Sequence, residues 1–146
     1  MRLIHFSADP VVSVWSSPQN TQAAPKPKGL WVSDEASEED GRLAVAHEVV
    51  LAESANILRV DDVDGIDELT RQHVVGEYAR DGYRLNWSAV AEQYQGILIT
   101  PYQWTRRLSM HCGWYYGWDC ASGCIWDASA VASIAVVELA PLVGEP

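Results

Sequence analysis

The chain has 146 residues, of which 48% are hydrophobic and 21% charged, and its formal net charge is −10. We expect residues 1–146 to form one domain, with a proline-rich loop at 16–28 and a tail at 140–146. The excess of acidic over basic residues excludes a general binder of duplex DNA. No apolar run is long enough to span a membrane. The chain has three cysteines and no secretory signal, which predicts reduced thiols in a cytoplasm.

Short apolar segments in the first half of the chain predict strands at 3–6, 11–15, 29–33 and 56–60. Residues 44–51 fit either a helix or a strand. Helical spacing of apolar residues predicts a helix over about 65–80, capped by Asp61 or Asp62, and a short helix over 87–94, capped by Asn86.

The second half predicts a buried strand at 97–99, an aperiodic aromatic and glycine-rich stretch at 102–123, and strands at 124–127 and 134–139. A turn or short helix is expected at 128–133. Many short mixed or antiparallel strands around a cleft, with two modest helices, make the predicted fold class α+β.

Half of the acidic residues lie in two short runs. The first run contains Asp34, Glu35, Glu38, Glu39 and Asp40, and the second contains Asp61, Asp62, Asp64, Asp67 and Glu68. They fit solvated loops or helix starts. They also fit a charged surface that imitates nucleic acid or binds a basic partner.

Aromatic residues gather between positions 102 and 126. Trp104, Trp114, Trp118 and Trp126 fall in one 23-residue stretch with Tyr115 and Tyr116, and Tyr102 lies just before it. Such a cluster forms either the main core or the lining of a pocket for a flat ligand.

Several short motifs follow one another in a recognisable order. His5 lies on the first predicted strand, Lys-Gly-Leu-Trp-Val-Ser follows at 28–33, and a late Gly-Cys-Ile-Trp-Asp strand at 123–127 precedes Val-Ala-Ser-Ile at 131–134. This order resembles the ADP-ribosyltransferase fold of the diphtheria-toxin and poly(ADP-ribose) polymerase type. The chain also looks like small proteins carried by phages of actinobacteria.

The resemblance implies that NAD is bound as a substrate. His5 would then hydrogen-bond a ribose hydroxyl, the backbone of Phe6 would meet the nicotinamide amide, and Ser33 would lie near the nicotinamide ribose. An aromatic ring from Tyr102, Trp104, Trp114 or Tyr115 would stack on the nicotinamide. The implied cofactor-binding set is Phe6, Ser7, Trp31, Ser33, Tyr102, Trp104, Trp114, Tyr115 and Ser122.

The chain departs from the family pattern at two places. The residue after the histidine is usually glycine, and here it is Phe6. The catalytic glutamate of the family starts the late strand, where this chain has Ser122 or Gly123. Asp119 lies a few residues upstream and Glu138 lies on the last predicted strand, so the implied catalytic set is His5, Asp119 and Glu138.

Two further features of the sequence are a group of possible metal ligands and a pair of adjacent arginines. His111 and the cysteines at 112, 120 and 124 do not have the paired spacing of zinc knuckles, so no metal site is predicted. Arg106 and Arg107 either hold a phosphate or pair with the acidic runs.

The sequence therefore predicts an NAD-dependent ADP-ribosyltransferase-like enzyme with an unknown protein or nucleic-acid acceptor, located in a cytoplasm (the host cytoplasm for a phage protein). Two alternatives stay open. One is an acidic protein that binds and inhibits a basic host partner. The other is a nucleotide-binding module without turnover.

Overall fold

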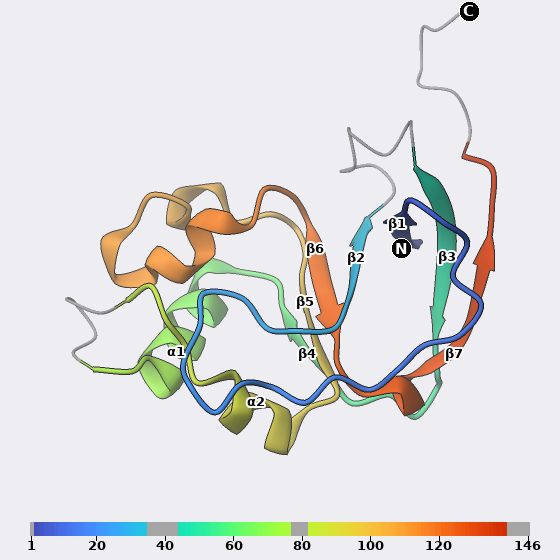
Figure 1. Cartoon of the computed structure of the whole chain (residues 1–146). Helices are drawn as coiled ribbons and strands as arrows, with labels where there is room; N and C mark the ends of the chain where they lie inside the picture. Colours follow the sequence, from blue (N-terminus) through green and yellow to red (C-terminus); the bar gives the residue numbers. More distant parts are fainter. Residues whose placement is uncertain (1, 35–43, 77–81, 140–146) are drawn as a thin grey trace, which may run out of the picture.

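In the computed structural model, which describes residues 2–34, 44–76 and 82–139, seven strands form one sheet. Its order is β4-β5-β6-β2-β1-β3-β7 (Figure 1). The strands are β1 (Leu3–Ser7), β2 (Leu30–Asp34), β3 (Val45–Leu51), β4 (Ile57–Val60), β5 (Gly96–Ile99), β6 (Ser122–Ile125) and β7 (Val131–Val136). The β4–β5 pair is parallel and the other pairs are antiparallel, so the molecule is α+β with a mixed sheet.

Two short helices follow β4, and both begin at a capping side chain. Asp62 accepts a hydrogen bond from the backbone N–H of Gly65 and caps α1 (Val63–His73). Asn86 accepts one from Ala89 and caps α2 (Trp87–Gln93). Short polar side chains of this kind satisfy N–H groups that have no partner within the helix.

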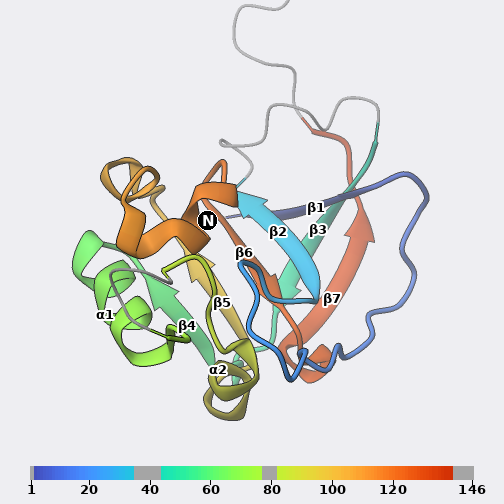
Figure 2. The ribbon, with the colours of Figure 1, turned by 60° about the vertical axis from the view of Figure 1, so that its left-hand side comes forward.

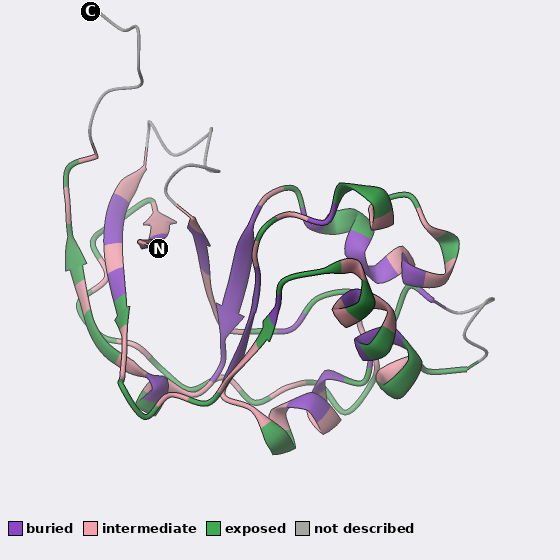
Figure 3. Cartoon of the chain, turned by 180° about the vertical axis from the view of Figure 1, so that it is seen from behind, coloured by how far each residue is buried: buried purple, intermediate pink, exposed green. Residues whose placement is uncertain are grey.

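The sheet curls, and each face has its own core. The larger core joins α1, α2 and the 3-10 helix η4 (Met110–Gly117) to the β4–β5–β6 half of the sheet. The smaller core contains Leu3, Val32, Val49 and Leu98 from four different strands. Every residue of β5 and β6 is buried, whereas β7 is largely exposed (Figure 3).

The segment between β1 and β2, residues 8–29, is a long strap. It runs from the end of β1 along the edge of the molecule to α2 and returns to β2 (Figures 1 and 2). Backbone hydrogen bonds join Ser17 to Trp126 and Ala24 to Leu85, and the indole of Trp87 donates to the Ala24 carbonyl. These bonds fix the part of the strap that approaches β2.

Several predicted boundaries need correction. The strand predicted at 11–15 is wrong: these residues belong to the strap, because β2 and β3 already occupy the two sides of β1. The segment 44–51 is a strand rather than a helix. Helix α1 ends at His73, where Val74 is extended and forms a bridge with Leu85; residues 77–81 lie outside the described part of the chain.

The two late strands begin earlier than predicted. Strand β6 covers 122–125 rather than 124–127, and β7 covers 131–136 rather than 134–139. The 3-10 helix η5 (Ala128–Ala130) provides the predicted short helical turn between them. Acidic residues 35–40 and the tail 140–146 lie outside the described residues. Within 2–34, 44–76 and 82–139, no helix has the length and apolar character needed to cross a membrane.

Candidate functional site

The sheet opens between β1 and β2. These strands pair only at Leu3 with Asp34 and at Ile4 with Ser33, whereas β1 continues to pair with β3 as far as Ser7. At the end of the β1–β2 ladder, Nδ1 of His5 lies 2.6 Å from the backbone carbonyl of Trp31. A side chain therefore bridges the two strands where backbone pairing has stopped.

This contact fixes the orientation of the His5 ring. A carbonyl only accepts, so Nδ1 of His5 donates. In the neutral ring Nε2 then carries the lone pair, and it has no protein partner within the described ranges. The ring therefore presents a hydrogen-bond acceptor that is held in place by the neighbouring strand.

A second histidine supports the first. His47 is fully buried and pairs with His5 across the β1–β3 ladder. Its Nδ1 lies 3.1 Å from the His5 carbonyl, and its Nε2 accepts the backbone N–H of Val11 at 2.8 Å. Because both nitrogens of His47 are used, it positions the His5 backbone and the start of the strap rather than facing a ligand.

A cavity of about 310 Å³ lies at this opening. Six residues of the predicted site line it: His5, Phe6, Trp31, Ser33, Asp119 and Ser122. They come from β1, from β2 and from residues 119–122, which lead into β6 and include its first residue. Because β2 lies between β1 and β6 and Ser33 pairs directly with Ser122, three segments distant in sequence meet at one place.

Asp119 is the only carboxylate among the described residues that line this cavity. Its side chain is 79% exposed, and one oxygen lies 3.4 Å from the guanidinium of Arg107. Arg107 also lies over the ring of Tyr116, with its central carbon 5.6 Å from the ring centre. The carboxylate therefore stands at the mouth of the cavity beside a fixed positive charge.

Trp118 and Trp31 form the aromatic wall of the cavity. Their rings meet edge to face, with the centres 4.9 Å apart. The ammonium of Lys26 lies 5.2 Å from the centre of the Trp31 ring, so a cation borders the same wall. The indole N–H of Trp118 is buried and has no hydrogen-bond partner within the described chain. Such a donor is costly to leave unsatisfied.

Other predicted site residues lie elsewhere. Trp114 and Tyr115 are fully buried in the larger core, where the indole of Trp114 donates to the Thr70 hydroxyl and the Tyr115 hydroxyl accepts the backbone N–H of Gln103. Trp104 is 67% exposed. None of these three lines the cavity, so much of the aromatic cluster is core rather than a stacking surface.

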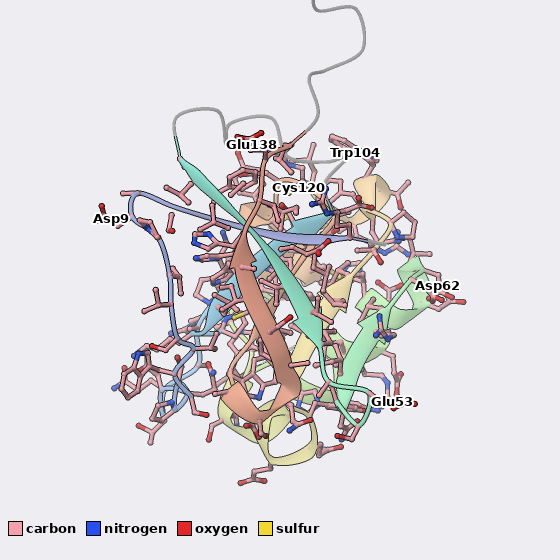
Figure 4. All side chains as sticks on the ribbon, turned by 90° about the vertical axis from the view of Figure 1, so that its right-hand side faces the viewer. Asp9, Glu53, Asp62, Trp104, Cys120 and Glu138 are labelled. Carbon is pink, nitrogen blue, oxygen red and sulfur yellow. The ribbon has the colours of Figure 1, made fainter. Side chains whose placement is uncertain are left out.

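Ser7, Tyr102 and Glu138 are also absent from the cavity wall. The Ser7 hydroxyl donates to the Asp9 carbonyl, and the Tyr102 hydroxyl donates to the Trp118 carbonyl. Glu138 follows β7 and is exposed (Figure 4). The structure therefore places Asp119, and not Glu138, on the wall of the cavity that His5 also lines.

Six cavity residues are not among the predicted site residues: Ile4, Lys26, Val32, Gly117, Trp118 and Cys120. Three of them belong to the dense 114–123 segment, whose aromatic and glycine content did signal a site. Lys26 lies between Pro25 and Pro27 in the strap. Only the folding of the strap across β2 brings it near the cavity.

The remaining candidates have structural partners. Arg106 forms a bidentate pair with Asp67 of the second acidic run at 2.8 and 2.9 Å, as the ion-pair interpretation predicts. Arg107 pairs instead with Asp119, which belongs to neither acidic run. All three cysteines are free. Burial raises the pKa of Cys112 to about 11, which keeps its thiol protonated at neutral pH and disfavours a nucleophilic role.

Comparison of the chain with models of protein families, with curated proteins and with solved structures found no match.

Proposed function

We propose that the cavity at the β1–β2 opening binds NAD and that the protein is an ADP-ribosyltransferase-like enzyme. The observation that carries this proposal is the convergence of His5, Ser33 and Asp119 on one cavity from three separate segments. The resemblance implies that His5 hydrogen-bonds a ribose hydroxyl and that Ser33 lies near the nicotinamide ribose, and it places His5 and Asp119 in the catalytic set.

The cavity has a suitable size and wall for part of a dinucleotide. Its volume of about 310 Å³ is near the lower end for small-molecule sites, which run from about 300 to 1,000 Å³. This space suits a nicotinamide–ribose unit, with the diphosphate and adenosine extending from the mouth. Lys26 at the rim supplies a positive charge for a phosphate in a chain whose net charge is −10.

One polar group and one aromatic wall of the cavity fit that unit. Nε2 of His5 accepts from a ribose hydroxyl while Nδ1 stays on the Trp31 carbonyl. The edge-to-face rings of Trp31 and Trp118 offer apolar surface to the nicotinamide ring.

The proposed reaction breaks the bond between the nicotinamide nitrogen and C1′ of the ribose. Nicotinamide leaves with the bonding electron pair as a neutral molecule, and C1′ develops oxocarbenium character. A nucleophilic oxygen or nitrogen of the acceptor, or of water, bonds to C1′ and gives its proton to the Asp119 carboxylate. A negative charge near C1′ also stabilises the positive centre, and no metal takes part in this step.

One observation favours a second candidate, nucleotide binding without turnover. Asp119 is largely exposed and is held by Arg107, and the cavity residue that starts β6 is Ser122 rather than an acid. If the ion pair keeps Asp119 away from C1′, the cavity binds NAD and leaves it intact.

Two assays on the same preparations test the proposal. NAD is expected to raise the melting temperature of the wild-type protein, and incubation is expected to release nicotinamide, measured by chromatography. Asp119→Asn should keep the thermal shift and lose the release, whereas His5→Ala should weaken both. Glu53→Gln is the matched carboxylate control, because Glu53 is exposed on the turn after β3 and lies at the opposite end of the molecule from cavity residue Cys120 (Figure 4).

The outcomes separate the two candidates. Binding with release supports the transferase, and binding without release supports the nucleotide-binding module. A folded wild-type protein that shows no thermal shift at millimolar NAD would overturn both.

A further inference from the structure

A cluster of potential metal ligands lies away from the NAD cavity, where α1 meets η4. Asp67 comes from α1, and His111 and Cys112 are adjacent on η4. One carboxylate oxygen, one imidazole nitrogen and the thiol sulfur all lie within 4.8 Å of one another. A carboxylate, an imidazole and a thiolate are all ligands that zinc uses.

Two of the interatomic distances match a tetrahedral site. Oδ1 of Asp67 lies 3.6 Å from Sγ of Cys112 and 3.6 Å from Nε2 of His111. In a tetrahedral zinc site with ordinary bond lengths, the sulfur–oxygen edge is about 3.6 Å and the nitrogen–oxygen edge is about 3.4 Å. The two edges that share Asp67 are therefore close to those of a bound ion, and the third edge, between the His111 nitrogen and the Cys112 sulfur, is within 4.8 Å.

The surroundings are closed on one side and open on the other. Cys112 is fully buried, and the Thr70 hydroxyl lies 3.6 Å from its sulfur. The side chains of Asp67 and His111 are 32% and 35% exposed. A metal held by these three residues would have a buried thiolate behind it and solvent in front, so water would fill the fourth position.

Arg106 is the group that most affects this site. Its Nε and one terminal nitrogen donate to Oδ1 and Oδ2 of Asp67 at 2.8 and 2.9 Å. An ionised carboxylate has about four acceptor positions, two on each oxygen, so Oδ1 can ligate a metal with one position while Nε of Arg106 occupies the other and the terminal nitrogen of Arg106 stays on Oδ2. Hydrogen bonds to the outer oxygen of a ligating carboxylate are usual in metal sites, where they orient the ligand.

We propose that Asp67, His111 and Cys112 form a binding site for a zinc-class divalent ion, with water as the fourth ligand. On binding, the metal replaces the thiol proton of Cys112, which is released to solvent, and bonds to the resulting thiolate. The ion would then fasten α1 to η4. This proposal does not depend on the proposed NAD chemistry, because none of the three residues lines that cavity.

Titration of the metal-free protein with Co²⁺ tests the proposal. The wild-type protein should bind one equivalent and develop the visible absorption of tetrahedral cobalt together with a sulfur-to-cobalt charge-transfer band. One equivalent of Zn²⁺ should remove both signals. His111→Gln and Asp67→Asn should each weaken binding at least tenfold, and Cys112→Ser should abolish the charge-transfer band.

Two neighbours on α1 provide matched controls. Glu68 is an exposed carboxylate held by Arg71, and His73 is a histidine outside the cluster, so Glu68→Gln and His73→Gln should bind like the wild-type protein. Cys112 is buried and its substitution can prevent folding, in which case the partly exposed His111 decides the question. A wild-type protein that takes up no stoichiometric Co²⁺ or Zn²⁺, or a folded His111→Gln variant with unchanged affinity, would overturn the proposal.

Discussion

The imidazole of His5 donates from Nδ1 to the backbone carbonyl of Trp31 over 2.6 Å, which joins β1 to β2 just beyond the end of their ladder. One ring nitrogen thus holds the sheet together where it opens. The other nitrogen is left as an acceptor beside the cavity. The same residue therefore has a structural role and a proposed binding role, and substitution should affect both.

His5→Ala should reduce the affinity for NAD about 3- to 10-fold, because one neutral hydrogen bond to the ligand contributes roughly 0.5–1.5 kcal/mol. The same change should lower the free energy of unfolding by about 1 kcal/mol, since the bond to Trp31 is also lost. Calorimetric titration and urea denaturation measure the two effects. An NAD affinity unchanged by the substitution would contradict the assignment of Nε2 to a ligand hydroxyl.

Two glycines near the site should respond differently to alanine. A Cβ at Gly123 would lie less than 3.0 Å from the backbone oxygen of Ile97 on β5, a distance that real Cβ atoms essentially never show. Gly123→Ala should therefore lower the free energy of unfolding by about 3 kcal/mol. A Cβ at Gly117 would meet only the flexible end of Lys26 at 3.1 Å. Gly117→Ala should therefore change stability little. Equal losses in urea denaturation would be inconsistent with this packing.

The capping role of Asp62 can be tested against its neighbour. Asp62→Ala removes the hydrogen bond to the Gly65 N–H and should lower the free energy of unfolding by about 1 kcal/mol. Asp61→Ala removes a charge of the same sign one residue earlier and should have a smaller effect, because Asp62 is the N-cap. If the Asp61 variant proves the less stable, the cap has been assigned to the wrong residue.

His73 should make stability depend on pH. Burial lowers the pKa of His73 below its ordinary value of 6.5, so the folded protein resists the proton that the unfolded chain takes up. This contribution is fully present above pH 6.5 and is lost as the pH falls through the lowered folded-state pKa. His73→Gln should therefore flatten the decline in unfolding free energy between pH 7.5 and 5. A parallel decline in the variant would argue against burial as the cause.

Local sequence signals predicted most of the elements. Asn86 and the Asp61–Asp62 pair marked helix starts because a cap depends on a few neighbouring residues. The alternation of apolar residues at 11–15 led to the wrong prediction of a strand. An extended segment outside a sheet can show the same alternation, and whether it pairs depends on the other strands. Val12 and Trp15 are 91% and 79% exposed, so no sheet face buries them.

The sequence predicted only part of the site, because the residues are recognisable one at a time but their meeting depends on the whole sheet. His5, Ser33 and Asp119 were picked out one by one, and the strand order brings them to one cavity. Periodicity could not separate Trp114, which fills the core, from Trp118, which also borders the cavity. The spacing of the cysteines did not predict the proposed metal site. That site combines Cys112 with Asp67 of α1, which lies more than 40 residues earlier in the chain, and no local pattern joins the two.

The indole N–H resonances of the seven tryptophans, followed by NMR during titration with NAD, test the central claim most directly. The proposal predicts that the signals of Trp118 and Trp31 shift and saturate, because both residues line the cavity. The signals of Trp87, Trp114 and Trp126 should stay in place, since their N–H groups donate to Ala24, Thr70 and Tyr94. A titration to millimolar NAD in which the Trp118 and Trp31 signals do not move would contradict the claim.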